Sequence, residues 1–201
     1  PMLVFGCLGK IVPDKVMAAC GSPMWGMNQS GVNAAGKPYA NMFFYNGGMG
    51  ATQIRDGATC LSWPSNVSST SIELSEQIAP LRFRHKKLRP DSGGPGRYRG
   101  GLGQEIMMES RSPTPIAVSF LAERTIFPAF GIEGGRPGAP GELHINGEKV
   151  DPKRQYVLKT GDTVRMGTPG GGGHGDPADR DAAAFERDTT AGYVTDPSAY
   201  R

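Results

Sequence analysis

The sequence predicts an α+β fold that is predominantly β, with glycine-rich loops between short strands and a helix near the C-terminal end. Short apolar runs rich in β-branched and aromatic residues recur along the chain, each bounded by turn residues. Glycine contributes 30 of the 201 residues, about twice its usual share, and is clustered between these runs. The stretch 177–190 is rich in Ala, Asp, Glu and Arg, which favours a helix.

In the first half of the chain the signals for regular structure are intermittent. Pro13 favours the start of a short helix near this position, because proline is tolerated in the first turn. The residues from Cys20 onward are typical of a loop, until the aromatic run 39–45 predicts a strand that the glycines of 47–51 terminate. Two further elements are expected, a helix at 71–76 and an alternating strand at 81–88.

In the second half short strands are separated by turn signals. Two apolar runs predict strands at 105–109 and 116–121. Asn146-Gly147 is a strong two-residue turn signal and predicts a hairpin over 142–149. A second hairpin is expected from strands at 155–158 and 163–166.

Charge and composition exclude several classes of partner. The net charge is only +3, and the basic run 82–89 alternates with Phe83 and Leu88, which favours a strand with a solvated face over a nucleic-acid site. No apolar run reaches 18 residues, so no membrane association is expected. The three cysteines form no CxxC pair, which argues against zinc and disulfides and favours a cytoplasmic location.

One stretch partly matches a phosphate-binding loop. Gly31 to Lys37 has the G-x-x-x-x-G-K spacing, but Pro38 occupies the position where Ser or Thr would hold magnesium. An aromatic strand follows where a helix is needed. We therefore interpret this stretch as an exposed hairpin turn and expect ATP to bind elsewhere.

Two glycine clusters, 93–103 and 170–175, admit two interpretations. Their glycines are suited to tight turns between strands, or to a wall where backbone passes close to a ligand. His174 lies beside Asp176 in the second cluster, but two groups are too few for a metal site, which needs three or four ligands. We interpret His174 as structural or solvent-facing.

The segment 88–101, which reads Leu-Arg-Pro-Asp-Ser-Gly-Gly-Pro-Gly-Arg-Tyr-Arg-Gly-Gly, is very similar to the signature region of hydantoinase B/oxoprolinase subunits. This group also includes related subunits of ketone carboxylases. Further similar blocks follow in family order at 47–51 with 55–57, 73–82, 123–124 leading to 134–141, and 168–177. The resemblance covers roughly residues 17–195.

The resemblance implies an ATP-dependent system for opening cyclic amides such as hydantoins or 5-oxoproline. A hydantoinase A-type partner would phosphorylate an unreactive amide oxygen, and the B-type part would handle ring opening. ATP and Mg²⁺ would then belong to the partner subunit. A divalent metal would belong to the N-terminal half of the B-type subunit, and no cofactor site is evident on this chain.

The same resemblance suggests an organisation for the chain. Residues 1–88 would be the C-terminal part of the core domain of a B-type subunit, 89–176 a β-rich glycine-loop domain, and 177–201 a helical tail. The expected partners are the N-terminal half of that subunit and an A-type subunit in a hetero-oligomer, with a small-molecule substrate and no nucleic acid or membrane. The chain alone is expected to be inactive.

Candidate site residues follow from the similar blocks, while the catalytic residues stay unassigned. Hydrogen-bond donors aimed at developing negative charge are what amide opening needs. The residues expected to line or shape the substrate region are Asp91, Ser92 and Arg99, with Gly171, Gly172, Gly173 and Asp176 as a second wall. Two alternatives stay open, a subunit of an ATP-dependent ketone carboxylase and a non-enzymatic assembly module.

Overall fold

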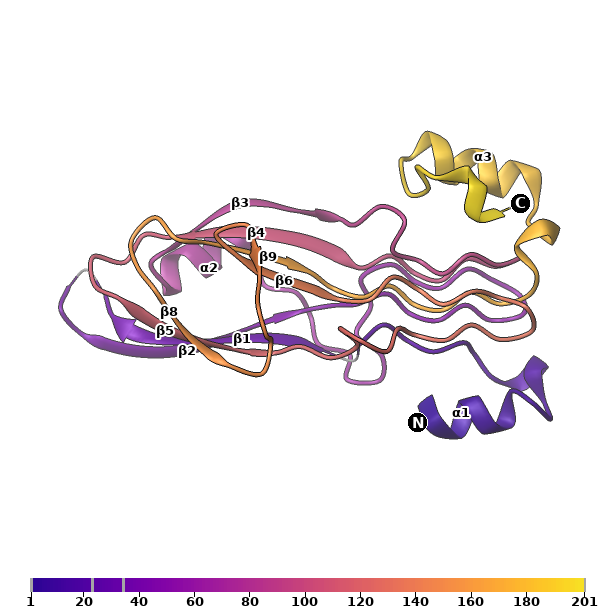
Figure 1. The fold of residues 1–201 in the computed structure, drawn as a ribbon, viewed down its shortest axis with the longest axis horizontal. Coiled ribbons are helices and arrows are strands. Elements are labelled where there is room, and N and C mark those ends of the chain that lie inside the picture. The colour runs from indigo at the N-terminus through magenta and orange to yellow at the C-terminus, as the bar shows by residue number, and fades with distance from the viewer. Residues whose placement is uncertain (1, 23, 34, 201) are drawn as a thin grey trace.

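The computed structural model describes residues 2–22, 24–33 and 35–200. A sandwich of two β-sheets occupies one end of an elongated molecule, and a bundle of extended, glycine-rich segments occupies the other (Figure 1). The helices α1 and α3 flank this bundle. Within the described residues the helical elements are α1 Met2–Leu8, η1 Pro13–Lys15, α2 Ile72–Ile78, η2 Pro177–Asp179, α3 Ala182–Thr190 and η3 Pro197–Tyr200.

The described residues form two antiparallel sheets, which confirms the predominantly β fold with a C-terminal helix. The strand orders are β2-β1-β5-β8 and β3-β4-β9-β6-β7. Both sheets combine strands from the two sides of residue 88. The strands are β1 Trp25–Val32, β2 Pro38–Tyr45, β3 Leu81–Leu88, β4 Gln104–Ser110, β5 Ile116–Leu121, β6 Glu142–Ile145, β7 Glu148–Lys149, β8 Gln155–Leu158 and β9 Thr163–Gly167.

The hydrophobic core lies between the two sheets. In β4 the burial alternates with the strand period of two, so that Ile106 and Met108 are fully buried while Glu105 and Glu109 face outward. Burying such an apolar side chain contributes about 1.5–3 kcal/mol. The opposite sheet supplies other buried members of the cluster, among them Trp25, Met27, Phe43, Ile116 and Val118.

Two sequence-based predictions are wrong in this sandwich. Strand β1 lies in a stretch predicted as loop, because its glycine and amide residues hide the alternation of Trp25 and Met27 toward the core. The second expected hairpin is also absent, because β8 pairs with β5 of one sheet whereas β9 pairs with β4 and β6 of the other. The turn between them carries the chain from sheet to sheet.

Several other predictions are confirmed. Asn146 and Gly147 have φ values of 52° and 84° in the turn that joins β6 and β7, as a type I′ hairpin requires. The side chain of Ser71 caps α2 by accepting from the Leu74 amide. The predicted helix at 177–190 is shorter than expected, since Asp181 caps α3 and a separate 3-10 turn precedes it.

The central segment of the bundle, residues 169–174, is buried along its length and bonds to neighbours on several sides. Gly170 and Gly173 donate to one neighbouring segment, 135–139, whereas the two amides between them donate to two others. A β-strand alternates its amides between two sides, so a repeat of three is that of a polyproline II helix. The N–H···O pairs are Gly170–Ala139, Gly171–Gly101, Gly172–Ala19 and Gly173–Arg136, at 3.2, 2.9, 2.8 and 3.0 Å.

Glycine is required here by close backbone approach. A Cβ on Gly171 would lie 2.0 Å from the Met49 carbonyl oxygen, and one on Gly100 would lie 1.9 Å from the Gly171 carbonyl oxygen. Neither residue is among those with positive φ. Of the two interpretations of the glycine clusters, the tight turn is therefore wrong for these positions.

The described helices do not include one with the length and apolarity needed to cross a bilayer.

Replacement of a bundle glycine should lower the free energy of unfolding far more than replacement of a sheet glycine. Gly171→Ala places a methyl group against the fixed backbone of Met49 and Gly50, so we expect a loss of roughly 3–5 kcal/mol in the free energy of unfolding. Gly26→Ala is the matched control, because its Cβ would meet only the Leu121 side chain at 3.4 Å. Urea unfolding of both variants measures this, and equal stabilities would contradict close packing as the reason for glycine.

Candidate functional site

Ser92 lies at the junction of the bundle and the sandwich and is fully buried. Its hydroxyl donates to the Arg89 carbonyl at 2.6 Å and accepts from the Gly103 amide at 3.0 Å. Its own carbonyl accepts from Ala139 in a neighbouring segment. The hydroxyl thus acts as donor and as acceptor, and it joins the two ends of the glycine-rich segment.

Asp91 and Asp176, the two predicted carboxylates, lie in different places and cap backbone turns. Asp91 has a φ of 55°, and its carboxylate accepts from the Thr195 amide at 2.7 Å and from the Thr195 hydroxyl. Asp176 is exposed and accepts from the Ala178 amide at 2.9 Å at the start of η2. Asp91 thereby attaches the segment after α3 to the bundle.

Arg99 belongs to a network of two arginines and two aspartates, in which the side chains of Arg99, Arg180 and Asp188 are buried and that of Asp56 is partly exposed. Its Nε donates to Asp188 Oδ2 at 3.0 Å, and its Nη1 donates to the Gly100 carbonyl at 2.6 Å. Arg180 forms a two-point contact with Asp56, at 2.9 and 2.8 Å, and also reaches Asp188 at 2.5 Å. The four charges sum to zero, and the network fastens α3 to the bundle.

The protonation behaviour of this network follows from its pairing. Burial opposes ionisation of Asp56, but hydrogen bonding and charge attraction from Arg180 outweigh it and lower the pKa of Asp56 below its usual value. Burial would likewise lower the pKa of Arg180, yet the Asp56 carboxylate raises that pKa above its usual value. Both groups therefore carry full charge at neutral pH.

Sequence reasoning found Arg99 but missed Asp56, Arg180 and Asp188. The partners of Arg99 and Arg180 lie 89 and 124 residues away along the chain. No periodicity in the sequence pairs residues that are so far apart, so the sequence alone does not show which aspartate each arginine binds. The predicted residues Ser92, Arg99 and 171–173 are brought together around the bundle, whereas Asp176 lies beyond its end.

His174 is buried at 7% exposure and bridges two segments through its backbone. Among the described residues its Nε2 atom has no hydrogen-bond partner. The described part of the chain contains no group of three or more His, Cys, Asp or Glu side chains placed to hold a metal ion.

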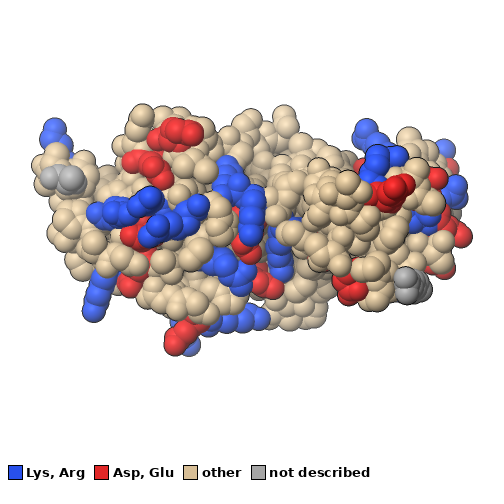
Figure 2. Space-filling model, turned by 90° about the horizontal axis from the view of Figure 1, so that it is seen from above, with Lys and Arg blue, Asp and Glu red and all other residues tan. Residues whose placement is uncertain are grey.

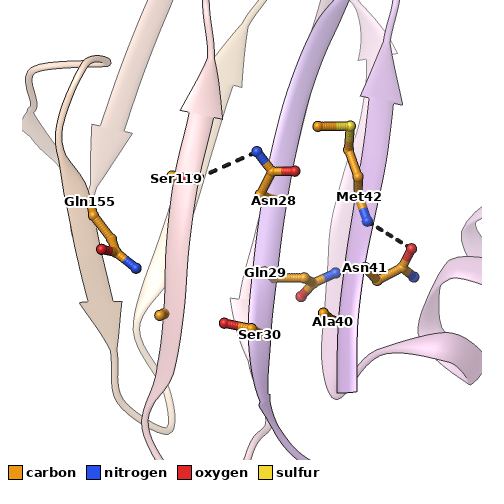
Figure 3. A pocket seen from close by; sticks show the side chains of 9 residues that line it. Asn28, Gln29, Ser30, Ala40, Asn41, Met42, Ser119 and Gln155 are labelled. Atoms are coloured by element: carbon orange, nitrogen blue, oxygen red, sulfur yellow. Dashed lines mark hydrogen bonds between the residues drawn. The ribbon is translucent and has the colours of Figure 1, made fainter. Parts of the chain in front are cut away.

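A shallow hollow of about 480 Å³ lies on the outer face of the β2-β1-β5-β8 sheet (Figure 3). The register and strand alternation place only uncharged side chains on this face. We call it the uncharged face. Its residues are Gly26, Asn28, Ser30, Val32, Pro38, Ala40, Met42, Phe44, Ala117, Ser119, Leu121, Gln155 and Val157.

The outer face of the other sheet has the opposite character. Figure 2, seen from the side of β3, shows acidic and basic side chains intermixed over the sandwich. The single carboxylate of Glu105 contacts three basic side chains, His85 Nε2 at 2.9 Å, Lys87 Nζ at 3.2 Å and Arg165 Nη1 at 3.1 Å. This confirms a solvated charged face for the basic strand β3.

Removal of one carboxylate from the buried network should destabilise the protein. Asp188→Asn leaves Arg99 and Arg180 with less compensating charge, and we expect a loss of about 3–5 kcal/mol in the free energy of unfolding. Asp179→Asn, an exposed position close by, is the matched control and should change little. Thermal unfolding measures both, and a tolerated Asp188→Asn would show that α3 is held by other contacts.

The sequence of this chain is similar to those of known proteins. The family model "Hydantoinase B/oxoprolinase" matches residues 1–177. The caprolactamase subunit beta of Pseudomonas jessenii is 31% identical over 94% of this chain. The chain covers 35% of the length of that subunit, so it spans about a third of this relative.

Two solved structures share the fold. The ATP-dependent caprolactamase from Pseudomonas jessenii superposes with a TM-score of 0.80 over 94% of this chain and 35% of its own, at 22% identity. A nucleotide-free acetone carboxylase superposes with a TM-score of 0.78 over 96% of this chain and 31% of its own, also at 22% identity. At this identity the likeness establishes the fold alone. The family match over residues 1–177 shows that the chain belongs to the hydantoinase B/oxoprolinase family.

Proposed function

We propose that this chain is the C-terminal part of a B-type subunit of an ATP-dependent cyclic-amide hydrolase. The observation that carries the proposal is the similarity to the caprolactamase subunit beta, which extends over 94% of the chain at 31% identity. The similarity covers both the sandwich and the bundle, so it reaches beyond a single motif. The substrate class would be lactams or hydantoins.

In this proposal the chemistry is divided between subunits. An amide carbonyl is a poor electrophile, and phosphorylation of its oxygen by an A-type partner, using ATP and Mg²⁺, provides a leaving group and lowers the barrier to attack by water. The residues of the present chain would shape the region where the activated ring is held. Turnover therefore requires the complete complex.

The predicted site residues fit such a positioning role. Ser92 and Arg99 are bonded within the bundle, and Gly171 allows its segments to touch. Asp91 and Asp176 fix the turns that leave the bundle. A wall with so many cross-bonds holds its shape to within the small tolerance that catalysis demands. We propose that these residues act through the bundle rather than by touching the reacting atoms.

The uncharged face provides a surface for the remainder of the subunit. Surfaces covered in an assembly are depleted in charge at their centre, whereas the charged sheet face on the other side is suited to solvent. The matching caprolactamase subunit is about three times as long as this chain, since the chain covers 35% of it. We propose that the upstream part of the B-type subunit packs on the uncharged face.

A ketone carboxylase is the second candidate, because the fold is also that of acetone carboxylase, with a TM-score of 0.78. The two enzymes differ in whether bicarbonate is a co-substrate. That difference provides the assay.

ATP hydrolysis by the reconstituted complex should distinguish the two activities. We expect a lactam such as caprolactam or 5-oxoproline to stimulate ATP turnover at least about tenfold, equivalent to roughly 1.4 kcal/mol of barrier. Added bicarbonate should leave that rate unchanged. A rate of ATP hydrolysis that depends on acetone and bicarbonate together, with no response to any lactam, would identify the complex as a ketone carboxylase.

Charge placed on the uncharged face should destabilise the complete subunit. Ser30→Arg buries a cation without a partner if the upstream part covers this exposed residue, which should lower the unfolding temperature by roughly 5–10 °C. Ala35→Arg is the matched control, since it adds the same charge to the exposed turn between β1 and β2.

Equal unfolding temperatures for the two variants would show that the uncharged face is free in the subunit. A stable Ser30→Arg subunit that no longer retains the A-type partner would assign the face to that partner, and would overturn the occupant proposed above.

A further inference from the structure

A second hollow, of about 380 Å³, lies where the sandwich meets the bundle. It is separate from the uncharged face and from the network around Arg99. Strand β3 contributes Lys86 and Leu88, and the start of β4 contributes Gln104. The facing wall comes from Asn46, Cys60 and Ser69.

Lys86 is a half-buried cation in this hollow with no carboxylate partner among the described residues. Its ammonium group donates to the Ser69 hydroxyl and to the Thr70 carbonyl at 3.1 Å. An ammonium group has three N–H donors, so one of them has no protein acceptor in the described structure. Burial lowers the pKa of Lys86, as expected for a cation drawn partly out of water.

Neighbouring residues do not neutralise this charge. Burial raises the pKa of the Cys60 thiol to about 11, so the thiol is protonated and neutral at pH 7. Lys87, the adjacent lysine on the rim, has a carboxylate partner in Glu105 at 3.2 Å. Lys86 therefore offers an uncompensated positive charge to whatever enters the hollow.

The backbone around the hollow is fixed independently of any ligand. Cys60 has a φ of 52° and is held by a hydrogen bond from its amide to the Leu102 carbonyl at 2.9 Å. The Asn46 side chain donates to the Cys60 carbonyl at 3.1 Å and accepts from Ser62. Gln104 donates to the Asn46 carbonyl. A pocket with rigid walls loses little entropy when it binds.

The chemistry of the walls selects the kind of anion. A phosphate dianion is bound by several donors, often from arginine, whereas the lining of this hollow contains no arginine, and of its two lysines only Lys86 has no carboxylate partner among the described residues. The aliphatic stem of Lys86 and the side chain of Leu88 add apolar surface. A carboxylate on a short aliphatic body matches this combination of one charge and apolar contact.

We propose that this hollow binds a small organic carboxylate, with the Lys86 ammonium group holding the carboxylate and Leu88 contacting its aliphatic part. The site does not depend on the amide-hydrolase function proposed above, because its test measures binding and no turnover. Occupancy would place the ligand beside the Cys60 thiol, which gives the experiment its probe.

Alkylation of Cys60 by iodoacetamide in the complete polypeptide, at mildly alkaline pH, reports occupancy through peptide mass spectrometry. At a pentanoate concentration about ten times its dissociation constant, the rate at Cys60 should fall roughly tenfold, because about one site in eleven is then free. Cys7 is exposed and serves as the internal control. Pentanamide, which has the same shape without the charge, should protect much less.

Variants of the two lysines test the assignment. Lys86→Gln should abolish protection by pentanoate, whereas Lys86→Arg and the control Lys87→Gln should retain it. Calorimetric titration with pentanoate provides a second readout should Cys60 react too slowly to follow, with binding expected in the wild type and lost in Lys86→Gln.

Retained protection and heat of binding in Lys86→Gln would overturn the proposal. So would equal slowing at Cys7 and Cys60, or absence of pentanoate binding by both methods. Stronger protection by inorganic phosphate than by pentanoate would overturn the assignment to carboxylates.

Discussion

The rest of the structure depends on the three-way hydrogen bonding of the segment 169–174. Successive amides of this segment donate to different neighbours, so it acts as the axis around which the other glycine-rich segments are arranged. Side chains would prevent this arrangement, as a Cβ on Gly171 or Gly172 would lie 2.0 Å from a carbonyl oxygen. The glycines of the bundle are thus the consequence of one packing requirement, the close approach of its backbone segments.

The bundle and the sandwich are stabilised by different physical means. The sandwich has a conventional apolar core, in which side chains such as Trp25 and Met108 exclude water. The interior of the bundle consists largely of backbone, so its cohesion comes from hydrogen bonds between neighbouring segments. Its edge is closed by charged side chains, where Arg99 and Arg180 join α3 to the segments beneath.

The sequence predicted those features that depend on neighbouring residues. The apolar run 105–109 and the Asn146-Gly147 turn are local signals, and the strand and the hairpin that they predict are both confirmed. Strand β1 was missed because its outward positions are small and polar, which resembles a loop in the absence of its partners. The turn before β9 was recognised, but a local signal does not determine which sheet the next strand joins.

The candidate site was also predicted only in part, because some of its contacts join residues that are far apart in the sequence. Ser92, Arg99 and the central glycines were named from a family resemblance, and the structure places them together around the bundle. Their role at the substrate stays a prediction. Asp56, Arg180 and Asp188 were not found, because their contacts connect positions separated by up to 124 residues. Such contacts are visible only once the chain is folded.

The order of segments in the bundle also has a consequence for biosynthesis. The amide of Gly172 bonds to Ala19, and that of Gly171 to Gly101, so the axis of the bundle is translated long after the segments that surround it. Until residues 169–174 leave the ribosome, those earlier segments have no common partner, and the carbonyl groups of Ala19 and Gly101 lack the donors that they have in the folded protein. Contacts of such large sequence separation form slowly, because loop closure must precede them. The bundle therefore closes only after its axis has been synthesised, although the segments that surround this axis are made much earlier.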